Sequence, residues 1–449
     1  MVSPSFELLY KIKNTENLIK TNQLQLLSEK AQLQPDQYID ITTYNKLDQI
    51  KPWIEHPKPV SITSLADLPI RDNILVICVD FIDKPAQRTT SDIYNRFFSS
   101  TGKTFRNYYS ENSYSKYIPE GNVHGWYRAP QLSTYYTDAE YGLGAYPNNT
   151  QRLVEDIIEI ISQDPAINWS YIDNDGDNYI DYLLIVHSGA EAASSGNTGD
   201  FWAHVNRITP QIRNGYTFEY YALCAEYISS PSETSVIGVD CHEFGHILGL
   251  PDLYDYSETS YGIGTFSLMS HGSWANEGMT PTHFDAWCKF YLGYITLIDN
   301  ITGYISLNTI ETNNIAIRYY NISNTTEQFI IENRQNILFD TYLPGNGLLI
   351  WKINYSKYTN DDKTCFKVGL VQADGQHHLE NMLNYGDSGD FYPGTTLNRT
   401  LNQTSIPNTI LCNGTTRDLN IYNISNSAST MTFSVSVTCI TPTCTLQLS

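Results

Sequence analysis

The sequence has few basic residues and no long apolar run. Of its 449 residues, 27 are Lys or Arg and 48 are Asp or Glu, which gives a formal net charge of −21. A surface of this sign repels nucleic acid and anionic lipid headgroups, so we expect neither as a partner. No apolar stretch approaches the roughly 20 residues that a membrane-spanning helix needs, so we expect no membrane insertion.

Cysteine is sparse but even in number. The eight cysteines permit up to four disulfides, and Cys365–Cys412 and Cys439–Cys444 are two candidate pairs, although pairing cannot be derived from sequence alone. Many asparagines stand in Asn-x-Ser/Thr sequons, which matter only in a host that glycosylates. These asparagines are Asn148, Asn168, Asn300, Asn321, Asn324, Asn354, Asn398, Asn402, Asn413 and Asn423.

One short motif indicates metal chemistry. His242 and His246 are four residues apart within an apolar segment, so on a helix they lie on one face and can bind one metal ion. Glu243 follows the first histidine, where its carboxylate can reach a water molecule at the metal. A buried helix without a metal would leave these polar groups short of partners, at a cost of several kcal/mol. The motif therefore predicts a zinc hydrolase with Glu243 as the catalytic base.

The residues after this helix predict a third ligand. Gly249 permits a left-handed helix end and Pro251 prevents continuation, so the chain turns and brings Asp252 back toward the histidines. Asp252 stands where the longer metzincin motif has its third histidine, and Asp255 is the alternative. A glutamate ligand on a later helix is disfavoured, because Glu258 lies in a polar loop and Glu277 in a Gly-rich stretch before a proline.

A methionine follows the predicted ligands. Met269 stands in Ser267–Ser270, at the place of the turn that metzincins have beneath the metal. Its thioether would form an apolar floor for the site. His271 lies nearby, and we expect it to be a wall or structural residue.

Together, these features resemble the immune inhibitor A-type metalloproteases, a metzincin-like family of secreted endopeptidases. The resemblance covers about residues 70–437. Outside the metal helix it is carried by segments at residues 105–114, 173–181, 281–287, 332–335, 347–351 and 372–375. The chain departs from the family at Lys352 and Asn354, where such proteins often have histidine and aspartate. The resemblance implies extracellular proteolysis, one catalytic zinc ion and structural calcium.

An acidic loop is a candidate calcium site. Four aspartates fall at positions 1, 3, 5 and 9 of a calcium-binding loop, the backbone carbonyl of Tyr179 can serve at position 7, and Asn178 stands where EF-hands have glycine. The aspartates are Asp173, Asp175, Asp177 and Asp181. Leu184 replaces the closing glutamate, so the loop is not an EF-hand. Asp387 and Asp390 form a second calcium candidate, with a plain turn as the alternative. His377 and His378 are adjacent, but no third metal-binding residue is expected near them.

The order of predicted elements indicates three parts. Residues 1–66 are expected to be helical, either as a prosegment or as an accessory helix. Residues 67–300 are expected to form the catalytic domain, an α+β or α/β metzincin-like fold with strands at 73–80 and 181–186, a helix at 153–161, and a Gly/Ser-rich loop before the metal helix. Residues 301–449 are expected to form a β-rich, sandwich-like domain, with strands at 315–320, 328–331, 348–351 and 431–437.

The sequence thus predicts a monomeric, secreted zinc endopeptidase that acts on protein or peptide substrates, although no signal peptide is visible at Met1–Phe6. Three alternatives remain. The chain could be a latent zymogen that is inactive until residues 1–66 are removed. It could be a non-catalytic binding protein that keeps the fold, or a calcium-dependent adhesion module that makes no use of the metal helix.

Overall fold

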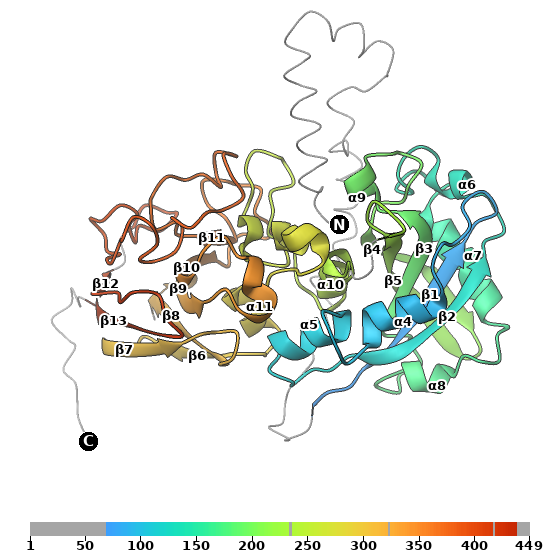
Figure 1. Ribbon diagram of the computed structural model, residues 1–449, viewed down its shortest axis with the longest axis horizontal. Helices are drawn as coiled ribbons and strands as arrows, with labels where there is room; N and C mark the ends of the chain where they lie inside the picture. Colours follow the sequence, from blue (N-terminus) through green and yellow to red (C-terminus); the bar gives the residue numbers. More distant parts are fainter. Residues whose placement is uncertain (1–68, 233–235, 322–323, 416–417, 438–449) are drawn as a thin grey trace, which may run out of the picture. The chain divides into compact units, whose positions relative to one another are not determined.

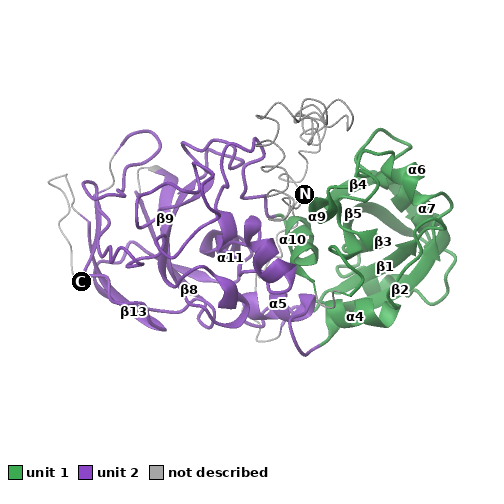
Figure 2. Cartoon of the chain, turned by 45° about the horizontal axis from the view of Figure 1, so that its top comes forward, with its two compact units in different colours: residues 1–61, 71–99, 119–249 green, residues 62–70, 100–118, 250–449 purple. Residues whose placement is uncertain are grey.

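The structure is a computed structural model that describes residues 69–232, 236–321, 324–415 and 418–437. The predicted helical segment at 1–66 and the candidate pair Cys439–Cys444 lie outside these residues. The described residues form two compact units, one from 71–99 and 119–249 and the other from 69–70, 100–118 and 250–437 (Figure 2).

The first unit is built on a five-stranded sheet in the order β2-β1-β3-β5-β4 (Figure 1). Strands β1, β2, β3 and β5 run parallel, and β4 pairs antiparallel with β5 at the edge. The strands are β1 (Asn73–Asp80), β2 (Glu120–Arg128), β3 (Leu183–Ala190), β4 (His204–Arg213) and β5 (Tyr216–Tyr227). β1 and β3 confirm the strands predicted at 73–80 and 181–186. Both are almost entirely buried, as expected for strands inside a parallel sheet.

The main helix of this unit is α7 (Thr150–Ile161), which confirms the helix predicted at 153–161. Asn149 caps it, because its side chain accepts a hydrogen bond from the backbone N–H of Arg152 at 3.2 Å. The apolar side chains Leu153, Ile157 and Ile161 recur at helical spacing and share one hydrophobic core with the strands.

The segment before the metal helix differs from the prediction. Only a loop was expected between residue 186 and this helix, and this was wrong, because β4 and β5 form a hairpin there. The turn is Asn214-Gly215, with φ of 54° and 88°. Two successive positive φ angles are what tight hairpin turns require, and Asn-Gly is a strong sequence signal for them.

The remaining helices are short. None in the described part of the chain combines the length and apolar composition that a membrane crossing needs. These helices are α4 (Thr90–Phe98), α5 (Phe105–Asn112), α6 (Ser133–Thr137), α8 (Trp169–Ile172), α9 (Ala192–Ser195), α10 (Gly238–Ile247) and α11 (Ala286–Tyr291), with 3-10 turns η3 (Gly264–Phe266), η4 (His271–Gly278) and η5 (Leu338–Tyr342).

The second unit is rich in strands. A five-stranded sheet has the order β11-β10-β9-β8-β6 and a three-stranded sheet the order β12-β13-β7, and both contribute to one hydrophobic core. The strands are β6 (Thr296–Asp299), β7 (Gly303–Asn308), β8 (Ile315–Asn321), β9 (Asn324–Arg334), β10 (Gly347–Asn354), β11 (Val368–Leu370), β12 (Leu419–Tyr422) and β13 (Thr430–Val437). β8, β9, β10 and β13 confirm the four predicted strands. The predicted mixed α/β fold is confirmed at this level.

The second unit also contains a disulfide. Cys365 and Cys412 are bonded, as proposed from the sequence. The other four cysteines within the described ranges are buried thiols, namely Cys78, Cys224, Cys241 and Cys288. Burial raises the pKa of each of these thiols, so they are poor nucleophiles.

Candidate active site

Helix α10, which carries both histidines of the motif, is anchored by a buried ion pair. Arg96 of α4 lies 3.1 Å from the carboxylate of Asp240 in the first turn of α10, and both side chains are almost fully buried. Arg96 also donates to the carbonyl oxygens of Ala225 and Glu226 at the end of β5. Burial raises the pKa of Asp240 to about 6, against the opposing effect of the guanidinium. Helix α10 is thereby fixed to the sheet at its N-terminal end.

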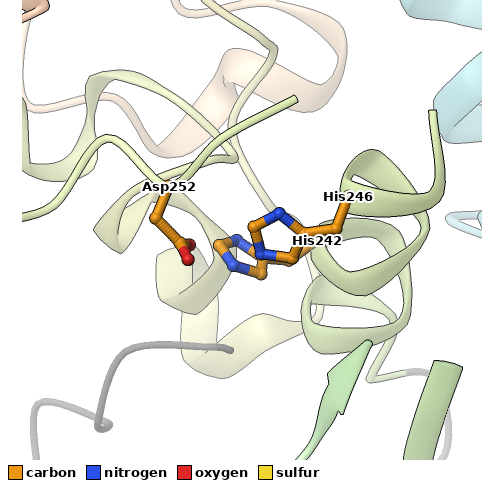
Figure 3. Close-up of side chains that lie close together, drawn as sticks. All are labelled: His242, His246 and Asp252. Carbon is orange, nitrogen blue, oxygen red and sulfur yellow. The ribbon is translucent and has the colours of Figure 1, made fainter. Parts of the chain in front are cut away.

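The structure brings together the three predicted metal ligands. His242 and His246 lie on successive turns of α10, with ring centroids 4.8 Å apart. Gly249 follows with φ of 92°, the left-handed helix end that the sequence predicted. The side chain of Asp252 then points toward both imidazoles (Figure 3), and one potential ligand atom from each residue lies within 4.8 Å of the others. Two nitrogens and one oxygen in this arrangement suit a divalent metal ion.

The carboxylate of Asp255, the alternative third ligand, is engaged in hydrogen bonds within its own turn. Its carboxylate accepts hydrogen bonds from the backbone N–H and hydroxyl of Ser257, at 2.7 and 2.5 Å, and from the hydroxyls of Thr259 and Ser260, each at 2.8 Å. Four donors therefore engage this buried carboxylate within its own turn. The geometry favours Asp252 over Asp255 as the ligand.

The segment around Asp252 is held by two further contacts. The phenol of Tyr256 donates a hydrogen bond to Asp252 Oδ2. The backbone N–H of Leu253 donates to the carbonyl oxygen of Met269 at 2.7 Å, and Met269 is fully buried. The predicted methionine turn thus packs directly against the segment that carries Asp252. His271 is buried among tyrosine rings, as expected of a wall residue, and its ring centroid lies 4.6 Å from that of Tyr385.

Glu243, the predicted base, is fully buried on α10. Its carboxylate interacts electrostatically with a second carboxyl group, that of Glu191. Glu191, at the end of β3, is also fully buried. Its Oε1 accepts hydrogen bonds from the backbone N–H groups of Ala193 and Ala203, at 3.2 and 2.9 Å, and its Oε2 has no hydrogen-bond partner. Burial raises the pKa of Glu191 to about 8, and the negative charge of Glu243 adds to the effect.

Comparison with known proteins identifies the family. Residues 68–295, just over half of the chain, match the family described as Immune inhibitor A peptidase M6, catalytic domain. The chain belongs to the immune inhibitor A peptidase M6 family. It is 31% identical over 265 residues to Immune inhibitor A of Bacillus thuringiensis subsp. alesti, and 29% identical over 274 residues to the Pre-pro-metalloprotease PrtV of Vibrio cholerae serotype O1.

These alignments cover only part of each peptidase M6 relative. They include 48% and 49% of this chain, but only 38% of Immune inhibitor A and 29% of PrtV. The family match at 68–295 contains the metal helix, Asp252 and Met269. The name of PrtV as a metalloprotease agrees with a metal-dependent family.

The peptidase M6 match also contains the predicted calcium loop. Asp173, Asp175 and Asp181 have carboxylate oxygens within 4.8 Å of one another, and Asp177 is not part of that group. Asp177 instead accepts a hydrogen bond from the Tyr179 backbone N–H at 2.9 Å. Asn178 has φ of 66°, the left-handed conformation that its position requires.

Beyond the peptidase M6 match, one acidic cluster differs from the prediction. His378 lies with Asp374 and Asp387 in a group whose potential ligand atoms are within 4.8 Å of one another, so the expectation that His378 has no partners was wrong. Asp390, predicted as the partner of Asp387, is instead buried and accepts a hydrogen bond from the Asp387 backbone N–H at 2.8 Å. Residues 379–386 form a loop that brings His378 and Asp387 together, and sequence spacing did not reveal it.

Sequence reasoning also missed Glu191 and Tyr256 as neighbours of the site. Glu191 lies 52 positions before Glu243 in a different element, so no spacing rule connects them. For Tyr256, the available sequence signal was the position of its phenol, four residues after a carboxylate ligand and within a tight turn.

Proposed function

We propose that this protein is a zinc-dependent endopeptidase. The observation that carries the proposal is the convergence of ligand atoms from His242, His246 and Asp252. Glu243, which directly follows His242 on α10, is fully buried. Three protein ligands of these types leave a coordination position for water or substrate, which is the composition of catalytic rather than structural zinc sites. Membership of a peptidase family supports the assignment.

The chemistry divides between the ion and the side chains. A bound zinc ion would lower the pKa of a water molecule and polarise the scissile carbonyl group. The role of Glu243 is that of a general base, which takes a proton from an attacking water molecule and delivers it to the leaving amine. Tyr256 uses its hydroxyl to orient Asp252, so its role here is to position a ligand.

The first test is the substitution Glu243→Ala. The variant should bind one zinc ion per chain, because its ligands are intact, and should cleave casein about 10²- to 10⁴-fold more slowly than the wild type. His246→Ala is the matched control and should lose both zinc and activity. Activity should be measured before and after limited proteolysis, so that a latent wild type is not mistaken for an inactive one.

Two outcomes would contradict this assignment. Full activity of the Glu243→Ala variant would exclude Glu243 as the base. A wild type that binds zinc but cleaves no protein after proteolytic treatment would favour the non-catalytic alternative.

We further propose that Asp173, Asp175, Asp177, Tyr179 and Asp181 hold a structural calcium ion. The convergence of three of the aspartates supports this, because like charges so close together repel one another without a cation. The second calcium candidate is the pair Asp387 and Asp390, of which only Asp387 belongs to the group with Asp374 and His378. Calcium should raise the melting temperature of the wild type but not of the Asp173→Asn/Asp175→Asn variant.

The proposed organisation is a prosegment at 1–66, a metzincin-like catalytic domain at 67–300 and a β-rich sandwich-like domain at 301–449. The peptidase M6 match at 68–295 supports the second part. The two sheets that share a core support the third. We also propose secretion and action on protein substrates as a monomer, and the words "pre-pro" in the name of PrtV agree with removal of an N-terminal segment.

A further inference from the structure

The loop between β10 and β11, residues 355–367, is bonded to the segment that carries Asp252. Within this loop, Asn360 is fully buried. Its Nδ2 donates to the carbonyl oxygen of Leu253 at 2.8 Å and to that of Val368 at 2.8 Å, and its Oδ1 accepts from the backbone N–H of Val368 at 3.1 Å. Leu253 directly follows Asp252. One amide group therefore ties the backbone beside the third ligand to strand β11.

The next residue of the loop makes a second connection. Asp361 Oδ1 accepts a hydrogen bond from the backbone N–H of Tyr256 at 2.9 Å. The phenol of Tyr256 in turn donates to Asp252 Oδ2. Asp361 thus fixes the backbone of the residue that orients the ligand carboxylate. Partners of this kind behind a metal ligand are worth about 10- to 100-fold in metal affinity in other proteins.

The loop itself is held by the disulfide. Cys365 lies five residues after Asn360 and is bonded to Cys412, which is distant in sequence. The Cys365 backbone N–H donates to the carbonyl oxygen of Asp362 at 2.8 Å. The disulfide therefore fixes the end of the loop next to β11. Both cysteines line a surface depression of about 420 Å³, where Cys365 is buried and Cys412 is half-buried.

We propose that Asn360 and Asp361 position Asp252, and that the Cys365–Cys412 disulfide holds these positioning residues, so that metal retention depends on the thiol redox state. The inference rests on the proposed function only in taking His242, His246 and Asp252 as the metal site. A dithiol opens the bond in two exchanges: its first thiolate attacks one cysteine sulfur and releases the other cysteine as a thiolate, and its second thiol then displaces the first cysteine. The products are two cysteine thiols and the cyclic disulfide of the reductant.

The positioning part of the proposal is tested with neighbouring aspartates. Asp361→Ala should release zinc to a chromophoric chelator about 10-fold faster or more than the wild type, whereas Asp361→Asn keeps an acceptor for the Tyr256 N–H and should restore most of the retention. Asp362→Ala is the matched control, because Asp362 bonds to Lys357 and Thr364 and not to the segment around Asp252. Melting temperatures show that each variant is folded.

The redox part is tested with Cys365→Ser/Cys412→Ser. Because dithiols also bind zinc, the wild type and this double variant are compared in the same dithiol, and alkylation followed by mass spectrometry reports which cysteines have opened. Without reductant, the wild type should retain zinc about 10-fold longer than the double variant. With the dithiol, the two should become equal. The four buried thiols should stay inert to alkylation in both proteins.

The outcomes separate the two proposals. If neither the wild type nor Glu243→Ala binds zinc, the proposed function fails. If both bind zinc and Asp361→Ala releases it at the wild-type rate, the positioning role is wrong. If alkylation shows an open disulfide while zinc release is unchanged, the redox dependence is wrong.

Discussion

At the scale of single residues, Glu191 makes a prediction about pH. Its pKa is raised by burial from its ordinary value of about 4.5 to about 8. The folded state therefore binds a proton that the unfolded chain releases. This contribution to stability is fully present below pH 4.5 and is lost as the pH rises toward 8.

Replacement by glutamine tests this assignment. Glu191→Gln keeps the acceptor for Ala193 and Ala203 and cannot ionise. Between pH 5 and pH 8, the stability of the variant relative to the wild type should rise by up to about 1.4 kcal/mol per pH unit. Urea unfolding at the two pH values measures the difference, with the exposed Glu140→Gln as the control. A difference that is the same at both pH values would exclude Glu191 as the titrating group.

The metal triad was predictable because its three residues lie within eleven consecutive positions. Helical spacing places the two histidines, and Gly249 and Pro251 determine the turn to Asp252. The residues behind the triad were not predictable. Asn360 and Asp361 are more than a hundred positions away, and only the packing of the loop before β11 brings them to Leu253 and Tyr256.

At the scale of elements, the Arg96–Asp240 pair makes the next prediction. Its charges are buried, and removal of one partner leaves the other charge uncompensated. We therefore expect Arg96→Ala or Asp240→Ala to lower the free energy of unfolding by about 3–5 kcal/mol. A double replacement by apolar residues of similar volume, Arg96→Met/Asp240→Leu, should recover a large part of that loss. Chemical denaturation measures all three variants.

A surface ion pair in the same unit provides the comparison. Arg213 and Glu159 are 2.8 Å apart with side chains 35% and 60% exposed, so Arg213→Ala should cost about 1 kcal/mol or less. Equal losses at the buried and the exposed pair would contradict the role assigned to Arg96 as the anchor of α10.

Elements with a strong apolar pattern were predicted correctly, and those defined by their partners were not. β1 and β3 are continuous apolar runs, and α7 has helical periodicity, so their sequences carry the information. β2 has no fully buried residue along its length, so its pattern does not show that it pairs with β1. β4 and β5 were overlooked because the Asn214-Gly215 turn between them was not recognised.

At the scale of the whole molecule, contacts between residues distant in sequence determine how the chain divides into compact units and which cysteines pair. The boundary near residue 300, expected from the change in strand pattern, stays a prediction. The two compact units exchange segments, since 100–118 belongs with 250–437, and sequence alone cannot show contacts between such distant segments. The Cys365–Cys412 pair was among many allowed pairings, and the folding of the β-rich half selects it.

Metal binding should stabilise the whole molecule, because the ion binds ligands that are brought together only in the folded chain. Zinc at about 100 times its dissociation constant should add about 2.7 kcal/mol to the free energy of unfolding. For units of this size, that corresponds to a rise in melting temperature of about 5–10 °C. Calorimetry after removal of metal with a chelator, and again after zinc is returned, measures the effect.

Two variants make the melting experiment specific to the proposed site. Glu243→Ala leaves the three ligands in place and should show the same rise with zinc as the wild type. His242→Ala removes one ligand and should show little or none, since only two of the three protein ligands remain. A wild-type rise that persists in His242→Ala would locate the stabilising zinc elsewhere, because loss of a ligand at the binding site must weaken binding there.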